Sequence, residues 1–173
     1  EWELRLVSEL YRCMTEAGLR CLNDPARAMS RVELLRTLEA AGINPFSAHR
    51  ADDAPRPKRF PVFIRSEYDH LPARPELYAT QADLDGALAA LRASGIPLRG
   101  QIVVELCTEP YAPGLWAKWG LYRFGEELVL DHIAVDDTWL VKIGDANKKT
   151  DSILDDERAA IEESRFATQM KPA

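Results

Sequence analysis

Four short strand-like segments follow one another in the second half of the chain. They are QIVVELC, LWAKWGLYRF, ELVLDHIA and TWLVKI, which fall between residues 101 and 143. The tetrapeptide at 124–127 contains a glycine and is typical of a tight hairpin, whereas residues 108–114 form a longer turn. The pattern predicts an antiparallel meander, and this restricts the chain to folds built around a mostly antiparallel sheet.

Helical periodicity accompanies these strands. Apolar side chains recur at helical spacing over residues 3–17, and a charged helix is expected over about 152–168. Capping signals precede two further helices, at Ser30 with Glu33 and at Thr80 with Asp83. Two more strands are expected, over residues 60–65 and, as a short one, within LRCLNDP at 19–25. The expected fold class is α+β, a mostly antiparallel sheet with helices laid on one face.

A segment rich in proline and basic residues interrupts the pattern. Residues 44–59 contain Pro45, Pro55 and Pro57 together with four arginine or lysine residues. Such a segment is typical of a linker or an exposed connection. We therefore expect a helix–strand–helix segment with this linker over residues 1–57, and a second lobe over residues 58–173.

Composition limits the classes of function. The 173 residues carry a formal net charge of −6, which argues against non-specific nucleic-acid binding. No apolar run approaches the roughly 20 residues of a transmembrane helix, so no membrane role is expected. Three cysteines without a C-x-x-C pair suggest a reducing cytoplasm. Phosphate-loop, Rossmann, nucleophile-elbow and histidine zinc motifs are absent, so we predict no metal site and assign no catalytic residue.

Charged residues occur at the ends of the predicted strands or within them. Arg65 ends one strand, Glu105 interrupts another, and Lys118, Arg123 and Lys142 lie between apolar neighbours. Because strand side chains alternate in direction, each of them could simply face solvent. If the four cations converge, they form a pocket suited to phosphate oxygens, with Glu105 available to hydroxyl or amine donors.

The order of these pieces resembles the nucleotide-binding lobe of ATP-grasp proteins. A strand ending in a cation is followed by a polar loop, a helix, an IVVE strand and a meander with further cations. The sequences RFPVFIRSEYDH, VVELC, AKWGLYRFGEELV and DTWLVK resemble an uncharacterised bacterial group with this fold, over most of residues 20–143. Residues 20–50 resemble the end of the preceding pre-ATP-grasp domain.

The resemblance implies a set of nucleotide-binding residues. It assigns Arg65 to a phosphate and the loop that starts at Ser66 to His70 to covering the phosphates. Glu105, Leu106 and Cys107 match the hinge that binds adenine, and Lys118 and Arg123 match cations for phosphate or substrate. The implied activity of the intact protein is ATP-dependent ligation of an unknown small carboxylate to an amine through an acyl-phosphate. ATP is the implied cofactor, and the sequence does not predict an oligomeric state.

Two departures from the family pattern leave alternatives open. The loop at 66–79 has no glycine, and no segment matches the late acidic strands that hold Mg²⁺ in this family. We therefore expect a fragment without that segment, with Mg²⁺ required only where the segment is present. The alternatives are a degenerate ATP-grasp-like module that binds a ligand or partner without chemistry, and an unrelated α+β domain.

Overall fold

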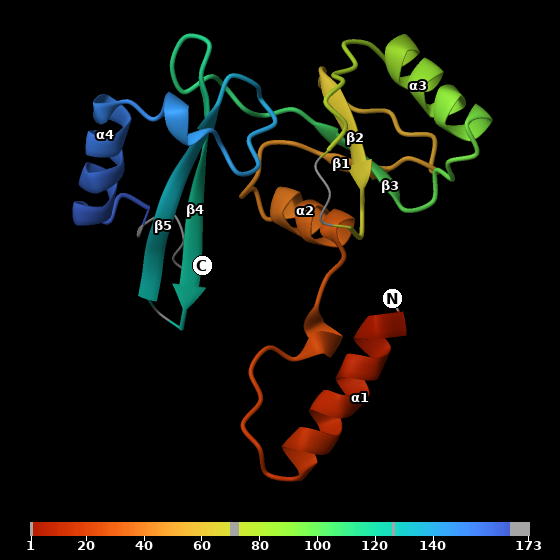
Figure 1. Cartoon of the computed structure of the whole chain (residues 1–173). Coiled ribbons are helices and arrows are strands. Elements are labelled where there is room, and N and C mark those ends of the chain that lie inside the picture. The colour runs from red at the N-terminus through yellow and green to blue at the C-terminus, as the bar shows by residue number, and fades with distance from the viewer. Residues whose placement is uncertain (1, 70–72, 126, 167–173) are drawn as a thin grey trace. The chain divides into compact units, whose positions relative to one another are not determined.

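The computed structural model describes residues 2–69, 73–125 and 127–166, and it has a mixed α+β fold (Figure 1). The chain divides into two compact units, one of residues 1–71 and 76–106 and one of residues 72–75 and 107–173. The helices are α1 (Trp2–Glu16), α2 (Arg31–Ala40), α3 (Gln81–Ala93) and α4 (Asp151–Glu162), with the short 3-10 helices η1 (Pro25–Arg27) and η2 (Ala146–Lys148). The strands are β1 (Ala48–Arg50), β2 (Val62–Ser66), β3 (Gln101–Glu105), β4 (Trp116–Phe124) and β5 (Glu127–Asp136).

The first unit is built on a three-stranded antiparallel sheet. Its strand order is β1-β3-β2, so β3 pairs along both of its edges. Because side chains alternate along a strand, each face of the sheet carries its own apolar cluster. One face packs Val62, Ile64 and Val103 against the buried leucines of α3, and the other packs Ile102 and Val104 against Val32 of α2. The sheet is thus covered on both faces.

Helix caps form as the sequence predicts. Ser30 and Thr80 accept hydrogen bonds from the N–H groups three residues on, and Glu33 and Asp83 complete the two capping boxes. These contacts satisfy N–H groups that have no partner within a helix, and so they fix where α2 and α3 begin. α1 and the hairpin of β4 and β5 also lie where the sequence predicts them.

The second unit is a long hairpin with one helix on it. β4 and β5 pair in antiparallel register, with an irregularity between Gly120 and Leu121 where β5 has one extra residue, Asp131. α4 packs Ile153 against Ile133 and Val135 of β5. The segment after β5 then folds back, and the N–H of Asp145 donates to the carbonyl of Val135 at 2.7 Å.

Several predicted elements are wrong. Residues 44–59, predicted as a linker, contain β1. Residues 138–143 and 19–25, both predicted as strands, form none, and η1 begins at Pro25. Helices cover both faces of the first sheet instead of one, because α2 and α3 each bury an apolar side. The meander was expected as one sheet, but β3 pairs with β1 and β2 while β4 and β5 form a separate hairpin.

Gly144 gives a test of packing in the second unit. A Cβ added there would lie 2.8 Å from the backbone nitrogen of Val135, and the backbone has a φ of +79°. At Gly114, where φ is +70°, an added Cβ meets nothing within 4 Å. We expect Gly114→Ala to cost about 1 kcal/mol for the positive φ alone, and Gly144→Ala about 2–4 kcal/mol. Urea unfolding followed by tryptophan fluorescence measures both losses, and equal losses would contradict the predicted clash.

Candidate functional site

Arg65 lies on β2, on the face of the sheet that packs against α2. It pairs with Ile102, which pairs on its other side with Arg50, so the two arginines flank one apolar residue. The Nε of Arg65 is buried and has no hydrogen-bond partner among the described residues. Burial lowers the pKa of Arg65, and the nearby charge of Arg31 lowers it further, whereas Asp69 raises it. Arg65 is therefore a cation that would gain from an added acceptor.

The backbone N–H groups of the loop after Arg65 donate hydrogen bonds to other groups of the chain. The N–H of Glu67 donates to the carbonyl of Gly100 at 2.8 Å, and those of Tyr68 and Asp69 donate to the hydroxyl of Ser66 at 3.3 Å. These three N–H groups are therefore already bonded, and a phosphate at residues 66–69 would be held mainly by side chains. His70, which the sequence also predicts, lies outside the described residues.

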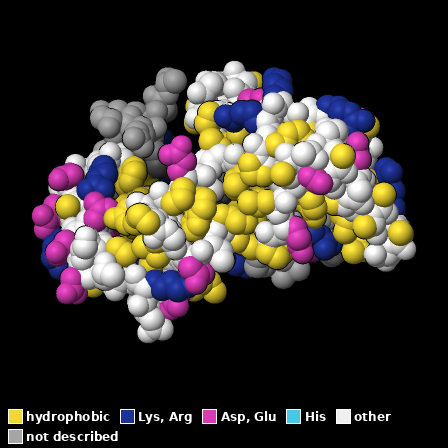
Figure 2. Space-filling view, turned by 90° about the horizontal axis from the view of Figure 1, so that it is seen from above, with side chains coloured by type: hydrophobic (Ala, Val, Ile, Leu, Met, Phe, Trp, Pro, Cys, Tyr) yellow, Lys and Arg dark blue, Asp and Glu magenta, His cyan; other side chains and the backbone are white. Residues whose placement is uncertain are grey.

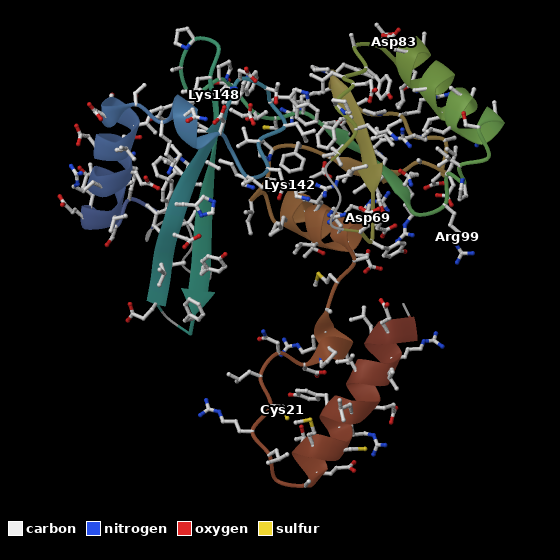
Figure 3. All side chains as sticks on the ribbon, in the orientation of Figure 1. Cys21, Asp69, Asp83, Arg99, Lys142 and Lys148 are labelled. Carbon is white, nitrogen blue, oxygen red and sulfur yellow. The ribbon has the colours of Figure 1, made fainter. Side chains whose placement is uncertain are left out.

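Two arginines that were not predicted surround the same loop. Arg31, the first residue of α2, donates to the carbonyls of Glu67 and Asp69, and Figure 3 labels Asp69 beside that helix. Arg50 donates to the carboxylate of Glu67 at 3.2 Å. We call Arg31, Arg50, Arg65 and Glu67 the arginine cluster. Of its arginines, only Arg65 could be found from the sequence, because Arg50 fell in the predicted linker and Arg31 looked like an ordinary helix residue.

Glu67 is the buried acid of the arginine cluster. Its side chain is fully shielded from solvent, and its Oε2 has no partner among the described residues. Burial lowers the pKa of Arg50, but the charge of Glu67 and a hydrogen bond with Tyr68 outweigh that effect, so the net shift is upward. Arg50 is therefore engaged by the protein itself, which leaves Arg65 as the arginine with a buried donor to offer.

Glu105, predicted at the nucleotide hinge, binds its own chain. Its side chain is 2% exposed, and its carboxylate accepts from the N–H groups of Ser47 at 3.0 Å, Lys58 at 2.8 Å and Arg59 at 3.2 Å. Burial raises the pKa of Glu105, but the hydrogen bonds from Ser47, Lys58 and Arg59 outweigh it, and the net pKa is lowered. The carboxylate therefore holds three chain segments together.

The two residues after Glu105 are less enclosed. The N–H of Leu106 donates to the carbonyl of Pro61 at 2.9 Å, so it is already used within the first unit. Cys107 is exposed, and the chain passes from the first unit to the second between Leu106 and Cys107.

The remaining predicted cations lie in the second unit. Lys118 is exposed on β4, and its Nζ donates to the carbonyl of Lys142 at 2.6 Å, which brings those two residues together. Arg123 is five residues further along β4, about 16 Å by strand geometry, and donates to the carbonyl of Gly125. Convergence of these cations with Arg65 stays a prediction.

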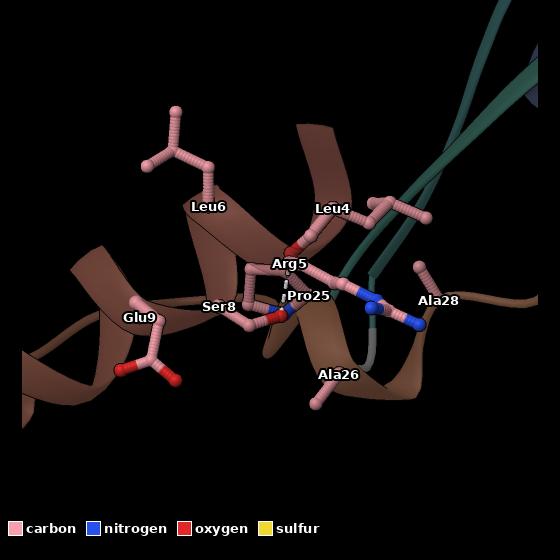
Figure 4. Close-up of a pocket in the computed structure, with 8 residues that line it drawn as sticks. All are labelled: Leu4, Arg5, Leu6, Ser8, Glu9, Pro25, Ala26 and Ala28. Atoms are coloured by element: carbon pink, nitrogen blue, oxygen red, sulfur yellow. Dashed lines mark hydrogen bonds between the residues drawn. The ribbon is translucent and has the colours of Figure 1, made fainter. Parts of the chain in front are cut away.

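Two surface features lie apart from the arginine cluster. On the face drawn in Figure 2, lysine and arginine side chains are scattered among acidic ones and do not form one basic region. The open pocket in Figure 4 lies between the first half of α1 and the residues around η1, and it is lined partly by Leu4, Leu6 and Pro25. Arg5, Ser8 and Glu9 also line it; the hydroxyl of Ser8 donates to the carbonyl of Leu4, and the carboxylate of Glu9 pairs with Arg12.

Glu105→Gln tests the role of that carboxylate. An amide cannot accept all three N–H groups, so we expect a loss of about 2–4 kcal/mol in the free energy of unfolding near pH 7. The folded pKa is depressed, so this stabilisation is present above the ordinary carboxyl pKa of 4.5 and is lost as pH falls through the folded value. Urea unfolding followed by circular dichroism measures it, with the exposed Glu76→Gln as the control. A loss that stays constant from neutral to acid pH would contradict the assignment.

No similarity to another protein assigns a function to these residues. The function proposed for this chain therefore rests on the fold of each unit and on the contacts of its polar side chains. Comparisons with protein-family models, with curated proteins and with solved structures gave no match for this chain.

Proposed function

We propose that this chain is an ATP-grasp-like module that binds a nucleotide phosphate through Arg65. One observation carries the proposal: the buried Nε of Arg65 has no partner within the described part of the chain, although a buried donor normally has one. A guanidinium can donate two parallel hydrogen bonds to the oxygens of a phosphate. An anion would also relieve the repulsion between Arg65 and Arg31.

In the intact protein the proposed reaction is ATP-dependent ligation of a small carboxylate through an acyl-phosphate. Lys118, Arg123 and Lys142 would supply further cations for phosphates, and the backbone of residues 105–107 would face the adenosine. Catalysis would come from positioning and charge stabilisation, with no side-chain nucleophile. Among the described residues there is no group of three or more histidine, cysteine or acidic side chains that could hold a metal, and Mg²⁺ would be required only where the acidic segment of the family is present. The proposal uses no step through that ion.

Titration with the non-hydrolysable analogue AMP-PNP tests nucleotide binding. We expect calorimetric binding with and without Mg²⁺, and an affinity at least about tenfold weaker in Arg65→Ala, because a charge-assisted contact is lost. Arg92→Ala, an exposed arginine in the last turn of α3, is the matched control and should bind like the unmodified chain. Lack of binding by the unmodified chain, or equal affinity in Arg65→Ala, would refute the proposal and favour an unrelated α+β domain.

A second candidate is a module that binds a ligand without chemistry. The N–H groups of Glu67, Tyr68 and Asp69 are all taken by the chain itself, whereas a loop that covers phosphates during transfer needs such groups free.

Phosphate release separates the two candidates. The protein would be incubated with ATP, Mg²⁺ and a panel of small carboxylates and amines. Release that depends on an added carboxylate and is lost in Arg65→Ala supports the ligase. Binding of AMP-PNP without any such release supports the non-catalytic module.

A further inference from the structure

Arg31 makes an unusual set of contacts for the first residue of a helix. Its Nη1 donates to the carbonyls of Ser66 and of Glu67, the latter at 3.0 Å, and its Nη2 donates to that of Asp69 at 2.9 Å. The three acceptors lie more than thirty residues away in the chain: Ser66 is the last residue of β2, and Glu67 and Asp69 follow the strand. One side chain thus binds three of the four carbonyl groups of residues 66–69, which we call the 66–69 segment.

The position of Arg31 has an electrostatic cost. The N-terminus of a helix carries partial positive charge, which disfavours a cation there. Arg31 also lies close enough to Arg65 for the two like charges to repel. The carbonyl contacts offset both effects, because a guanidinium carries five donors in a fixed plane.

The 66–69 segment is held from both sides. Arg31 takes its carbonyl groups, and the Ser66 hydroxyl and the Gly100 carbonyl take its N–H groups. The segment contains no glycine, so its backbone conformation is fixed by these hydrogen bonds and does not rely on the wider conformational range of glycine. Arg65 immediately precedes the segment and is held in β2 by pairing with β3. Asp69 lies close enough for its charge to act on Arg65, so the segment forms part of the surroundings of that guanidinium.

We propose that Arg31 is a positioning residue for the phosphate site at Arg65, because it holds the 66–69 segment in the conformation in which Arg65 can bind a phosphate. This role rests on the proposed nucleotide binding. It differs from a simple charge effect. A lysine at position 31 would keep the positive charge, but its single ammonium on a flexible stem could not reproduce the planar set of contacts.

The experiment compares Arg31→Lys and Arg31→Ala with the unmodified chain. Amide hydrogen exchange of Tyr68 and Asp69, read by NMR, reports on the 66–69 segment, and AMP-PNP titration reports on the site. We expect at least about tenfold faster exchange and about tenfold weaker binding in both variants, because several hydrogen bonds are lost. Arg92→Lys is the control, and unchanged exchange in α3 shows that each variant is folded.

The outcomes separate this role from its alternatives. The positioning role is overturned if amide exchange in both variants equals that of the unmodified chain. It is also overturned if exchange is faster but AMP-PNP affinity is unchanged, because Arg31 would then be purely structural. Arg31→Lys behaving like the unmodified chain would reduce the role to charge and overturn it as well. If the unmodified chain binds no AMP-PNP, the nucleotide proposal fails and the positioning role fails with it. The exchange rates then still show whether Arg31 holds the segment.

Discussion

Pairing of β3 along both of its edges is the interaction on which the first unit depends. β3 joins β1, from the first third of the chain, to β2, and its side chains supply both apolar clusters. At its end Glu105 accepts from the N–H groups of Ser47, Lys58 and Arg59. A buried carboxylate is costly unless it is well hydrogen-bonded, so this residue is tolerated because the neighbouring chain supplies donors.

The sequence predicts the elements whose signals are local. Both capping boxes depend on two residues three positions apart, and the apolar stripe of Leu84, Leu88 and Leu91 is buried as its spacing predicts. β1 could not be predicted, because its residues Ala48–Arg50 form a strand only through pairing with β3. Residues 138–143 show the opposite case. Their sequence alternates like that of a strand, but they form none, and among the described strands β5 pairs with β4 alone.

The candidate site was predictable only in part. Arg65 could be found because a charge at the end of an apolar run is visible in the sequence. Its neighbours Arg31 and Arg50 depend on tertiary contacts with Glu67 and the backbone, which leave no sequence pattern. The carboxylate of Glu105 accepts from three backbone donors, a role that composition cannot reveal, while nucleotide binding at residues 105–107 stays a prediction. An assignment of function from charged residues alone would therefore not have separated Glu105, whose carboxylate stabilises the fold, from Arg65, the candidate ligand-binding residue.

The donors to Glu105 have an evolutionary consequence. Two of them are main-chain N–H groups of Lys58 and Arg59, which any residue except proline can supply. Proline is therefore barred from both positions. The flanking residues follow this rule already, since Pro57 and Pro61 lie on either side of the required N–H groups. Arg59 also brings its Nε to 3.5 Å from the Glu105 carboxylate. Selection at position 59 would thus act on the side chain as well as on the backbone N–H, whereas at position 58 the required donor is the backbone N–H.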